Sequence, residues 1–301
     1  MVKYFVTGGS GFIGSKVIKF LIEDGDEVLA LARSDESATK LEKLGAKVLK
    51  GDLSNIEILK EGATETDGVL HLGFIHDFQN FENSAKTDRA AIEAFAQVLK
   101  QTNKPLVISS GALSLAQPIG LSPLDEHSKL PDSPFSNGPF GIRTETANYV
   151  ASLKDQGIRS SIVRLSPIVH GPNDHAFIVI LSQIAQKNGF AGYIDEGNNQ
   201  WTGVHVDDAA RLHILAAKKG IAGHYYHGVS SHDQTKDIAS AIGEKYKIPI
   251  KSLTLEEAKE SIGFLSTLFA ANLNVSIKYT KEELGWEPKE IGLIEDYKLN
   301  Y

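Results

Sequence analysis

Short apolar runs alternate with amphipathic segments along the first half of the chain. Between the apolar runs, hydrophobic residues recur at helical spacing over residues 14–23, 37–45, 88–100 and 141–153. Strands that alternate with helices predict a parallel sheet with right-handed crossovers, an α/β doubly wound fold whose ligands bind outside the carboxyl ends of the strands. The apolar runs that we expect to form strands are residues 2–6, 27–32, 47–50, 67–74, 106–108 and 162–165.

The alternation becomes less regular beyond Pro167. Asp207 stands where it would cap a helix over residues 208–218, and Thr254 opens another helix with Glu257 in the capping-box position. Other elements expected here are helices at 176–187 and 236–246 and strands at 204–206 and 224–227. We therefore expect two parts: residues 1–170 as the sheet domain and residues 171–301 as a smaller substrate-binding lobe, with residues 204–218 packing back on the sheet.

A glycine-rich turn joins the first strand to the first helix. Its sequence over residues 7–14 is Thr-Gly-Gly-Ser-Gly-Phe-Ile-Gly. Gly8 lets the chain leave the strand tightly, Gly11 lets backbone N–H groups approach a pyrophosphate, and Gly14 lets the helix lie close to the sheet. The free N–H groups at the helix start favour the anion, so the turn predicts the dinucleotide-binding unit of a Rossmann fold. The expected cofactor contacts in the turn are Gly8, Gly11, Phe12, Ile13 and Gly14.

The end of the second strand bears on which cofactor is bound. An NAD-binding unit carries an acidic residue there, about 20 residues past the glycines, that holds the ribose 2′-hydroxyl. This chain has Arg33 and Ser34 instead, and a guanidinium beside a hydroxyl suits the 2′-phosphate of NADP. We interpret Asp35 and Glu36 as caps or first-turn acids of the helix that follows. NADP is therefore favoured over NAD.

Two later strand ends contribute to the same expected site. Gly73, at the end of the 67–74 run, admits the cofactor closely because it has no side chain. Asp52, followed by Leu53, stands at the end of the third strand. Its carboxylate either accepts a hydrogen bond from an adenine amino group or serves as a turn acid, and both interpretations stay open.

Composition narrows the class of protein. The 301 residues are 42% hydrophobic and 23% charged, as in ordinary globular proteins. The net charge of −7, without a basic patch, argues against nucleic acid as a partner. The chain has no cysteine, which excludes disulfides and thiolate metal sites, and its histidines lack metal-ligand spacing. No apolar run has membrane-spanning length and the N-terminus enters a strand at once, so we expect a soluble, cytoplasmic protein.

Several motifs fall into one set: residues 7–14, Gly51-Asp52-Leu53, His71-Leu72-Gly73-Phe74, Ser109-Ser110 and His205-Val206-Asp207-Asp208. Together they resemble the extended short-chain dehydrogenases/reductases, and more specifically the NAD(P)-dependent epimerase/dehydratase group, over nearly the whole chain. Residues 32–37, 74–78 and 169–171 are similar to the branch that includes fungal and bacterial aldehyde reductases. The resemblance implies further cofactor contacts at Leu72, Phe74, Ser109, Pro167, Val169 and His170.

The family usually acts through a serine, a tyrosine and a lysine four residues after the tyrosine. The tyrosine passes the proton, the lysine lowers the pKa of the tyrosine, and the serine polarises the carbonyl. None of the nine tyrosines of this chain has a lysine four residues later. Phe140 and Thr144 stand where the pair is expected, and Gly111 corresponds to the usual serine position. This departure bears on the activity and not on the fold.

Four other residues are candidates for the chemistry. Arg143 offers a fixed positive charge, unless it is a surface residue of its helix. His170 follows the sixth strand, where the nicotinamide lies in the family, and either donates a proton near neutral pH or bonds to backbone. Ser109 and Ser110 supply hydroxyl groups at the end of the fifth strand.

Substrate contacts are expected beside these residues. His76 and Asp77 leave the fourth strand and either form an oriented His–Asp pair or stay apart. His205 is a further candidate that we interpret as structural. The aromatic candidates for pocket walls, each of which could equally belong to the core, are Phe78, Phe177 and Trp201.

The expected function is NADPH-dependent reduction of small aldehydes or ketones. A pocket would hold the carbonyl near the cofactor, and His170, a serine hydroxyl or an ordered water would protonate the alkoxide. A second hypothesis is a non-catalytic NADP-binding sensor, and a third, less favoured, is a sugar-nucleotide epimerase. We expect a monomer or a homodimer whose partner is a small-molecule carbonyl substrate.

Overall fold

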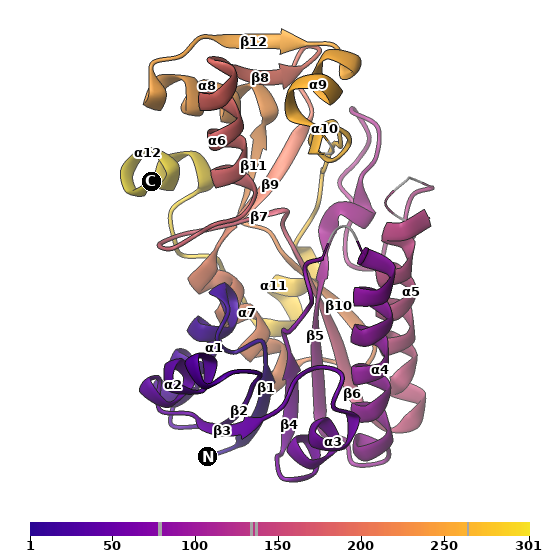
Figure 1. Ribbon diagram of the computed structural model, residues 1–301. Coiled ribbons are helices and arrows are strands. Elements are labelled where there is room, and N and C mark those ends of the chain that lie inside the picture. The colour runs from indigo at the N-terminus through magenta and orange to yellow at the C-terminus, as the bar shows by residue number, and fades with distance from the viewer. Residues whose placement is uncertain (78–79, 133–134, 136–137, 264) are drawn as a thin grey trace.

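The computed structural model describes residues 1–77, 80–132, 135, 138–263 and 265–301, and for residues 138–140 it describes the backbone alone. Its main sheet contains β1 (Lys3–Thr7), β2 (Glu27–Ala32), β3 (Lys47–Lys50), β4 (Gly68–His71), β5 (Pro105–Gly111), β6 (Arg159–Leu165) and β10 (His224–Gly228). All neighbouring strands are parallel, in the order β10-β6-β5-β4-β1-β2-β3 (Figure 1). The order reverses between β1 and β4, which is where open α/β sheets bind their ligands.

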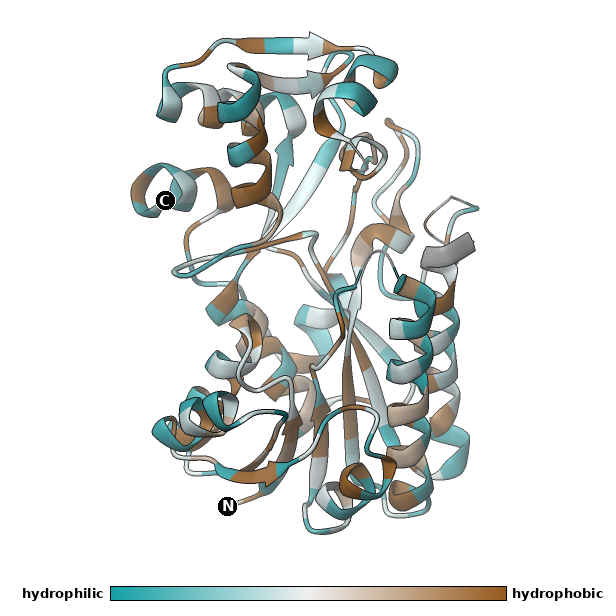
Figure 2. Cartoon of the chain, in the orientation of Figure 1, coloured by the Kyte–Doolittle hydropathy of each residue, from teal (hydrophilic) through white to brown (hydrophobic). Residues whose placement is uncertain are grey.

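Helices cover both faces of the main sheet (Figure 1). On one face, apolar side chains such as Val6 and Leu70 pack against α1 (Phe12–Glu23), α2 (Asp35–Lys43), α7 (Val206–Lys219) and α11 (Lys278–Leu284). On the other face, Phe5 and Ile162 pack against α3 (Ile56–Thr64), α4 (Phe81–Leu99) and α5 (Gly138–Ser152). Hydrophobic residues follow the central strands, and the outward turns of α2 and α4 are largely hydrophilic (Figure 2). Burial of these two apolar layers stabilises the sheet domain.

A smaller lobe stands beyond the carboxyl end of β6, because β7 (Ile168–His170) follows that strand after two residues. The lobe has its own core, in which Trp201 lies edge-on to Phe177 and Phe269. One of its sheets is β11-β9-β7, and the other pairs β12 with β8 (Figure 1). Its remaining elements are β8 (Ala191–Ile194), β9 (Gln200–His205), β11 (Ser231–Gln234), β12 (Ile250–Leu253), α6 (Phe177–Asn188), α8 (Thr235–Tyr246), α9 (Leu255–Ile262), α10 (Leu265–Phe269) and α12 (Leu293–Asn300).

The doubly wound parallel sheet expected from the alternation is confirmed, and two local expectations are corrected. The strand at 224–227, expected in the smaller lobe, is β10 of the main sheet, where Tyr226 pairs with Val163 of β6 and is buried in the sheet core. Asp207 does not cap α7, which begins one residue earlier. The ring of His205 caps it instead, accepting the N–H of Asp207, while the Asp207 carboxylate pairs with Lys16 at 2.8 Å. A carboxylate in the first turn still complements the helix dipole.

Within the described ranges, no helix is both long and apolar enough to cross a membrane.

Candidate cofactor and active site

The glycine turn between β1 and α1 is packed too tightly for side chains at two positions. Gly8 has φ +69°, and a Cβ there would lie 2.6 Å from the Gly73 nitrogen. A Cβ on Gly14 would lie 2.1 Å from the carbonyl oxygen of Gly8. The turn therefore brings the ends of β1 and β4 together at the switch point of the sheet and draws α1 against it.

Gly11 differs from these two glycines, because its neighbours leave room for a side chain. Its φ of −82° is open to any residue, and a Cβ would meet only the Gly8 oxygen, at 3.2 Å. Gly11 is the N-cap of α1 and no side chain caps the helix start. The N–H groups of the first turn, including those of Phe12 and Ile13, are thus open to an anion. This cradle fits a pyrophosphate, which a side chain at Gly11 would crowd.

A buried hydrogen-bond network fixes the strand ends around the turn. Thr7 Oγ1 accepts the N–H of Gly73 at 3.1 Å and lies 2.7 Å from His71 Nδ1. His71 Nε2 lies 3.1 Å from a carboxylate oxygen of Asp88 in α4. Because Thr7 Oγ1 already accepts the N–H of Gly73, its hydroxyl is able to donate to His71 Nδ1, and His71 Nε2 is then the donor to the Asp88 carboxyl group. Sequence reasoning placed His71 in a motif but did not find this network, whose members lie far apart in the chain.

At the end of β2, the residues expected to select the cofactor lie at the start of α2. Arg33 is exposed, and Ser34 is the N-cap of α2, accepting the N–H of Ser37 at 3.2 Å. Asp35 and Glu36 are first-turn acids, as interpreted from the sequence, and pair with Lys50 and Lys40. Arg33 directly precedes the N-cap at the positive end of α2, a combination that suits a phosphate group.

Asp52 acts mainly as a turn residue. One of its carboxylate oxygens accepts the N–H and the hydroxyl of Ser54, at 2.8 and 2.6 Å, and these bonds lower the pKa of Asp52. Of the two interpretations left open by the sequence, the geometry therefore supports the turn acid. Leu53 lines the same edge, because its Cδ1 would lie 3.4 Å from a Cβ on Gly73.

Arg143 of α5 lies against the carboxyl ends of β4 and β5. Its guanidinium stacks on the Phe74 ring at 4.0 Å and donates to the Ser109 carbonyl at 2.7 Å. Phe74 also contacts the ring of His76 edge-on, with centroids 5.3 Å apart. Burial lowers the pKa of His76 and the positive charge of Arg143 lowers it further, so this imidazole is neutral near pH 7. The structure therefore brings Phe74, His76, Ser109 and Arg143 together, and Arg143 is partly buried rather than a free surface residue.

Ser109 and Ser110 face opposite sides of β5, and only one of the two hydroxyl groups is committed. Ser109 Oγ lies 2.9 Å from His213 Nε2, and His213 donates through Nδ1 to the Ala209 carbonyl at 2.8 Å. The Ser109 hydroxyl is thus a donor to a buried helix histidine. Ser110 shares the parity of Ile108, which packs on the α5 face. Its hydroxyl is partly buried and has no hydrogen-bond partner among the described residues.

His170, expected as a proton donor, is turned away from open space, and that assignment is corrected. Its side chain has 0% exposure, and Nδ1 lies 2.6 Å from Asp296 of α12. Burial lowers the pKa of His170 despite the opposing effect of Asp296. Alternation along β7 explains the placement, because Val169 packs toward the sheet-domain core and its neighbour His170 must face the other way. In this conformation the ring is closed to a substrate, and its Nε2 has no hydrogen-bond partner among the described residues.

The other substrate-site candidates divide between core, cap and undescribed residues. Trp201 is buried in the lobe core and donates to the Leu268 carbonyl, so it is not an open pocket wall, and Phe177 packs beside it. His205 caps α7, as its structural interpretation requires. Phe78 and the side chain of Phe140 lie outside the described residues, and Asp77 is exposed before α4. Pro167 lies in the connection between β6 and β7.

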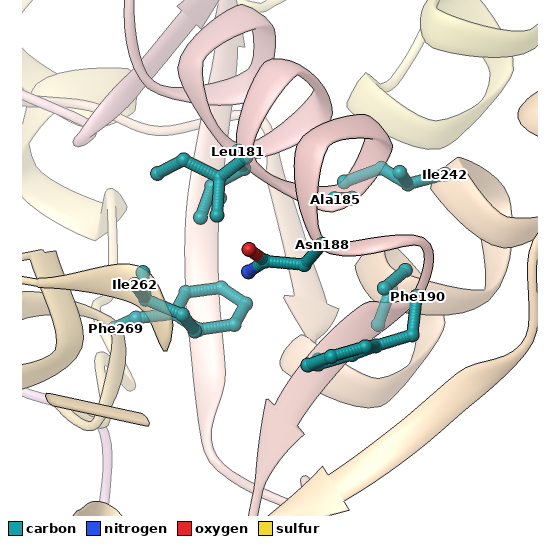
Figure 3. Close-up of a pocket in the computed structure, with 11 residues that line it drawn as sticks. Leu181, Ala185, Asn188, Phe190, Ile242, Ile262 and Phe269 are labelled. Atoms are coloured by element: carbon teal, nitrogen blue, oxygen red, sulfur yellow. The ribbon is translucent and has the colours of Figure 1, made fainter. Parts of the chain in front are cut away.

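A separate apolar pocket lies inside the lobe, between α6, α8 and α9 (Figure 3). Its cavity volume is only about 20 Å³. Asn188 is its polar lining residue, and the amide of Asn188 donates to the Ser261 carbonyl. None of the residues around the glycine turn lines this pocket. It is therefore distinct from the candidate cofactor site.

Comparisons with known proteins agree with this geometry. A family model described as the NAD dependent epimerase/dehydratase family matches residues 4–227. An uncharacterized protein of Saccharomyces cerevisiae is 44% identical, covering 100% of this chain and 99% of that protein. The 4-hydroxy-2-methyl-3-oxo-4-farnesyl-3,4-dihydroquinoline-1-oxide ketoreductase of Stigmatella aurantiaca is 29% identical over 75% of this chain and 67% of its own length. A dTDP-glucose 4,6-dehydratase of Streptomyces venezuelae with NAD bound has the same fold, with a TM-score of 0.77 at 18% identity over 98% of this chain and 96% of that chain.

Proposed function

The chain belongs to the NAD-dependent epimerase/dehydratase family, and from that premise we propose that it is an NADPH-dependent reductase of small aldehydes or ketones. Members of this family bind NAD(P). The choice of NADP is supported by the exposed Arg33 beside the start of α2, where the acids Asp35 and Glu36 are already paired with lysines. A ketoreductase among the relatives supports carbonyl reduction as the reaction class.

One observation carries the proposal: a guanidinium and an uncommitted hydroxyl lie on the same side of β5, at its carboxyl end. Arg143 is anchored by Phe74 and the Ser109 carbonyl, which uses one of its five N–H donors. Ser110 lies next to that carbonyl, and its hydroxyl has no partner among the described residues. Such donors stabilise the negative charge that develops on a carbonyl oxygen during reduction.

In the proposed reaction, different residues bind the cofactor and stabilise the reacting oxygen. The first-turn N–H groups of α1 would hold the pyrophosphate of NADPH, and Arg33 would hold its 2′-phosphate. When bound, NADPH supplies the hydride that is added to the carbonyl carbon. Arg143 stabilises the alkoxide oxygen, and Ser110 passes it a proton that is replaced from water. This arrangement replaces the tyrosine and lysine that the chain lacks, with a weaker proton donor as its consequence.

The test compares the two neighbouring serines. Native protein is mixed with NADPH and a panel of small aldehydes and ketones, and oxidation of NADPH is followed by absorbance. We expect turnover that Ser110→Ala lowers by about 10²-fold in kcat, the lower end of the range for a positioned proton donor, with little change in NADPH affinity. Ser109→Ala is the matched control, because its hydroxyl donates to His213 and should affect stability more than kcat. Equal loss in both variants contradicts the role of Ser110.

A second function, an NADP-binding sensor without catalysis, is favoured by one observation. Phe140 and Thr144 occupy the positions of the usual tyrosine and lysine, so the common proton donor is missing. The same experiment separates the two functions. Tight NADPH binding without turnover on the whole panel supports the sensor and rules out the reductase.

A further inference from the structure

The connection between β7 and α6, residues 171–176, is held from outside by Tyr301, the residue that follows the C-terminal helix α12. The hydroxyl of Tyr301 accepts the N–H of Gly171 at 2.9 Å and donates to Asp174 Oδ2 at 2.7 Å. Burial raises the pKa of Tyr301, so the hydroxyl keeps the proton that it donates. The other oxygen of Asp174 accepts the N–H of Ala176 at the start of α6. The hydroxyl of Tyr301 therefore binds both Gly171, at the start of the connection, and Asp174, in its second half.

A second contact, from α12 itself, secures the residue before the connection. Asp296 of α12 accepts a hydrogen bond from His170 at 2.6 Å, and its other oxygen accepts one from Asn300 at 2.8 Å. Both His170 and Asp296 have 0% exposure. A buried, charge-assisted hydrogen bond of this kind is costly to break, because the carboxylate would lose its partner in an apolar surrounding.

The backbone of the connection turns sharply at two positions. Gly171 has φ +138° and Asn173 has φ +73°, backbone conformations that glycine and asparagine adopt more readily than other residues. Most side-chain and turn hydrogen bonds of the connection stay within it or run into α6, and within the described part of the chain Tyr301 is the side chain that bonds it from elsewhere in the fold. Residues 171–176 are thus held mainly through Tyr301, which directly follows α12.

The far side of the connection borders the candidate cofactor and active site. The ring of His175 contacts the ring of Phe12 edge-on, with centroids 6.0 Å apart, at the start of α1. An electrostatic interaction with His175 is the smallest of the causes that lower the pKa of His76. Residues 171–176 therefore lie between Tyr301 on one side and Phe12, at the start of α1, on the other.

We propose that Tyr301 and Asp296 are positioning residues, which hold residues 171–176 in the conformation that forms one wall of the cofactor site beside Phe12. Neither residue touches the cofactor or the substrate. Tyr301 acts through Gly171 and Asp174, and Asp296 acts through His170. The effect on turnover rests on the proposed reductase function, whereas the effect on the connection itself does not.

The experiment uses two tyrosines of the C-terminal segment that differ in what their hydroxyls hold. Tyr301→Phe removes the hydroxyl that binds Gly171 and Asp174. Tyr297→Phe is the matched control, because its hydroxyl bonds Ser182 within α6, at 2.6 Å, and not the connection. For Tyr301→Phe we expect the Kd for NADPH and the KM for NADPH to rise about 10-fold, as loss of one or two hydrogen bonds predicts, with a smaller change in kcat. For Tyr297→Phe the Kd should stay within about twofold of the native value.

Hydrogen exchange measured on the full chain supplies a readout that does not depend on activity. Faster exchange of the amides of residues 171–176 is expected in Tyr301→Phe and not in Tyr297→Phe. For the second contact, Asp296→Asn keeps an acceptor for His170 and should retain more of the native affinity than Asp296→Leu does.

The outcomes separate this proposal from the proposed function. Unchanged Kd and unchanged exchange in Tyr301→Phe, or equal changes in the two tyrosine variants, overturn the positioning role. Failure of the native protein to bind NADPH overturns the proposed function instead. In that case the exchange rates of residues 171–176 still decide whether Tyr301 holds the connection.

Discussion

Two glycines of the turn that look equivalent in the sequence have different physical tasks. A Cβ on Gly14 would lie 2.1 Å from the carbonyl oxygen of Gly8, whereas a Cβ on Gly11 has only that oxygen near it, at 3.2 Å. Gly14 is therefore required by the fold itself. Gly11 is required only by the ligand, whose phosphates approach the N–H groups at the start of α1.

This difference predicts opposite phenotypes. Gly11→Val should keep a native circular dichroism spectrum and lose NADPH binding by more than about 100-fold, because its side chain occupies the phosphate space. Gly14→Ala should instead lower the free energy of unfolding by about 1–3 kcal/mol, the usual cost of overpacking. Urea titration and cofactor titration of both variants check the pair. Native cofactor affinity in Gly11→Val would mean that the phosphates bind elsewhere.

Arg33 is the residue on which the cofactor preference rests. Arg33→Asp should reverse or flatten the preference for NADPH over NADH, because a carboxylate repels the 2′-phosphate and accepts from a 2′-hydroxyl. Lys43→Asp is the control, since it makes the same change of charge in the last turn of α2, the helix that follows Arg33. Fluorescence titration with both cofactors measures the ratio of the two Kd values. A native preference for NADH contradicts the assignment.

At the scale of elements, the sequence predicts most helices and strands from local patterns, but it does not predict how distant strands pair. The alternation of apolar runs and amphipathic helices identified six strands of the main sheet, and the capping box of Thr254 and Glu257 is present at the start of α9. Membership of β10 in that sheet could not be read from residues 224–227, because it depends on pairing with β6. Helix α3 was missed although Ile56, Leu59 and Ala63 have helical spacing.

The candidate site divides in the same way. The glycine turn and Arg33 lie within one βαβ unit, so local pattern was sufficient to find them. His170 is hydrogen-bonded to Asp296, which lies 126 residues further along the chain. The sequence around His170 contains no pattern that predicts this contact. The period-two alternation of β7 did contain one hint, since Val169 and His170 cannot both face the cofactor. Thr7, His71 and Asp88 likewise meet only in the folded sheet.

The network around Thr7 predicts a measurable link between β1, β4 and α4. Thr7→Val keeps the shape of the side chain but leaves the Gly73 N–H and His71 Nδ1 without partners, at a cost of about 1–3 kcal/mol for each buried group. Because Gly73 lies against Gly8, NADPH affinity should fall as well. Thr7→Ser retains the hydroxyl and should restore both properties. Urea unfolding and NADPH titration that fail to distinguish Val from Ser would contradict the network.

At the scale of the whole molecule, two buried histidines join parts of the chain that are distant in sequence. His213 of α7 accepts the hydroxyl of Ser109, and burial lowers the pKa of His213 to about 4. His227 of β10 donates to the Ser276 carbonyl ahead of α11, and burial together with the charge of Arg164 lowers the pKa of His227 to about 3. Both rings are neutral in the folded protein at neutral pH, because a protonated ring would place a positive charge in a buried site.

These two histidines predict how stability depends on pH. An unfolded histidine has a pKa near 6.5, so between about pH 6.5 and pH 4 the unfolded chain takes up protons that the folded chain excludes. The free energy of unfolding should therefore fall as the pH is lowered through this window, with each histidine contributing a slope of up to about 1.4 kcal/mol per pH unit. His213→Gln removes one of these contributions and should flatten the slope, whereas the exposed His127→Gln should leave it unchanged. Urea unfolding at several pH values measures the slope. Equal slopes in the native protein and in His213→Gln would show that protonation of His213 does not contribute to the pH dependence of the free energy of unfolding.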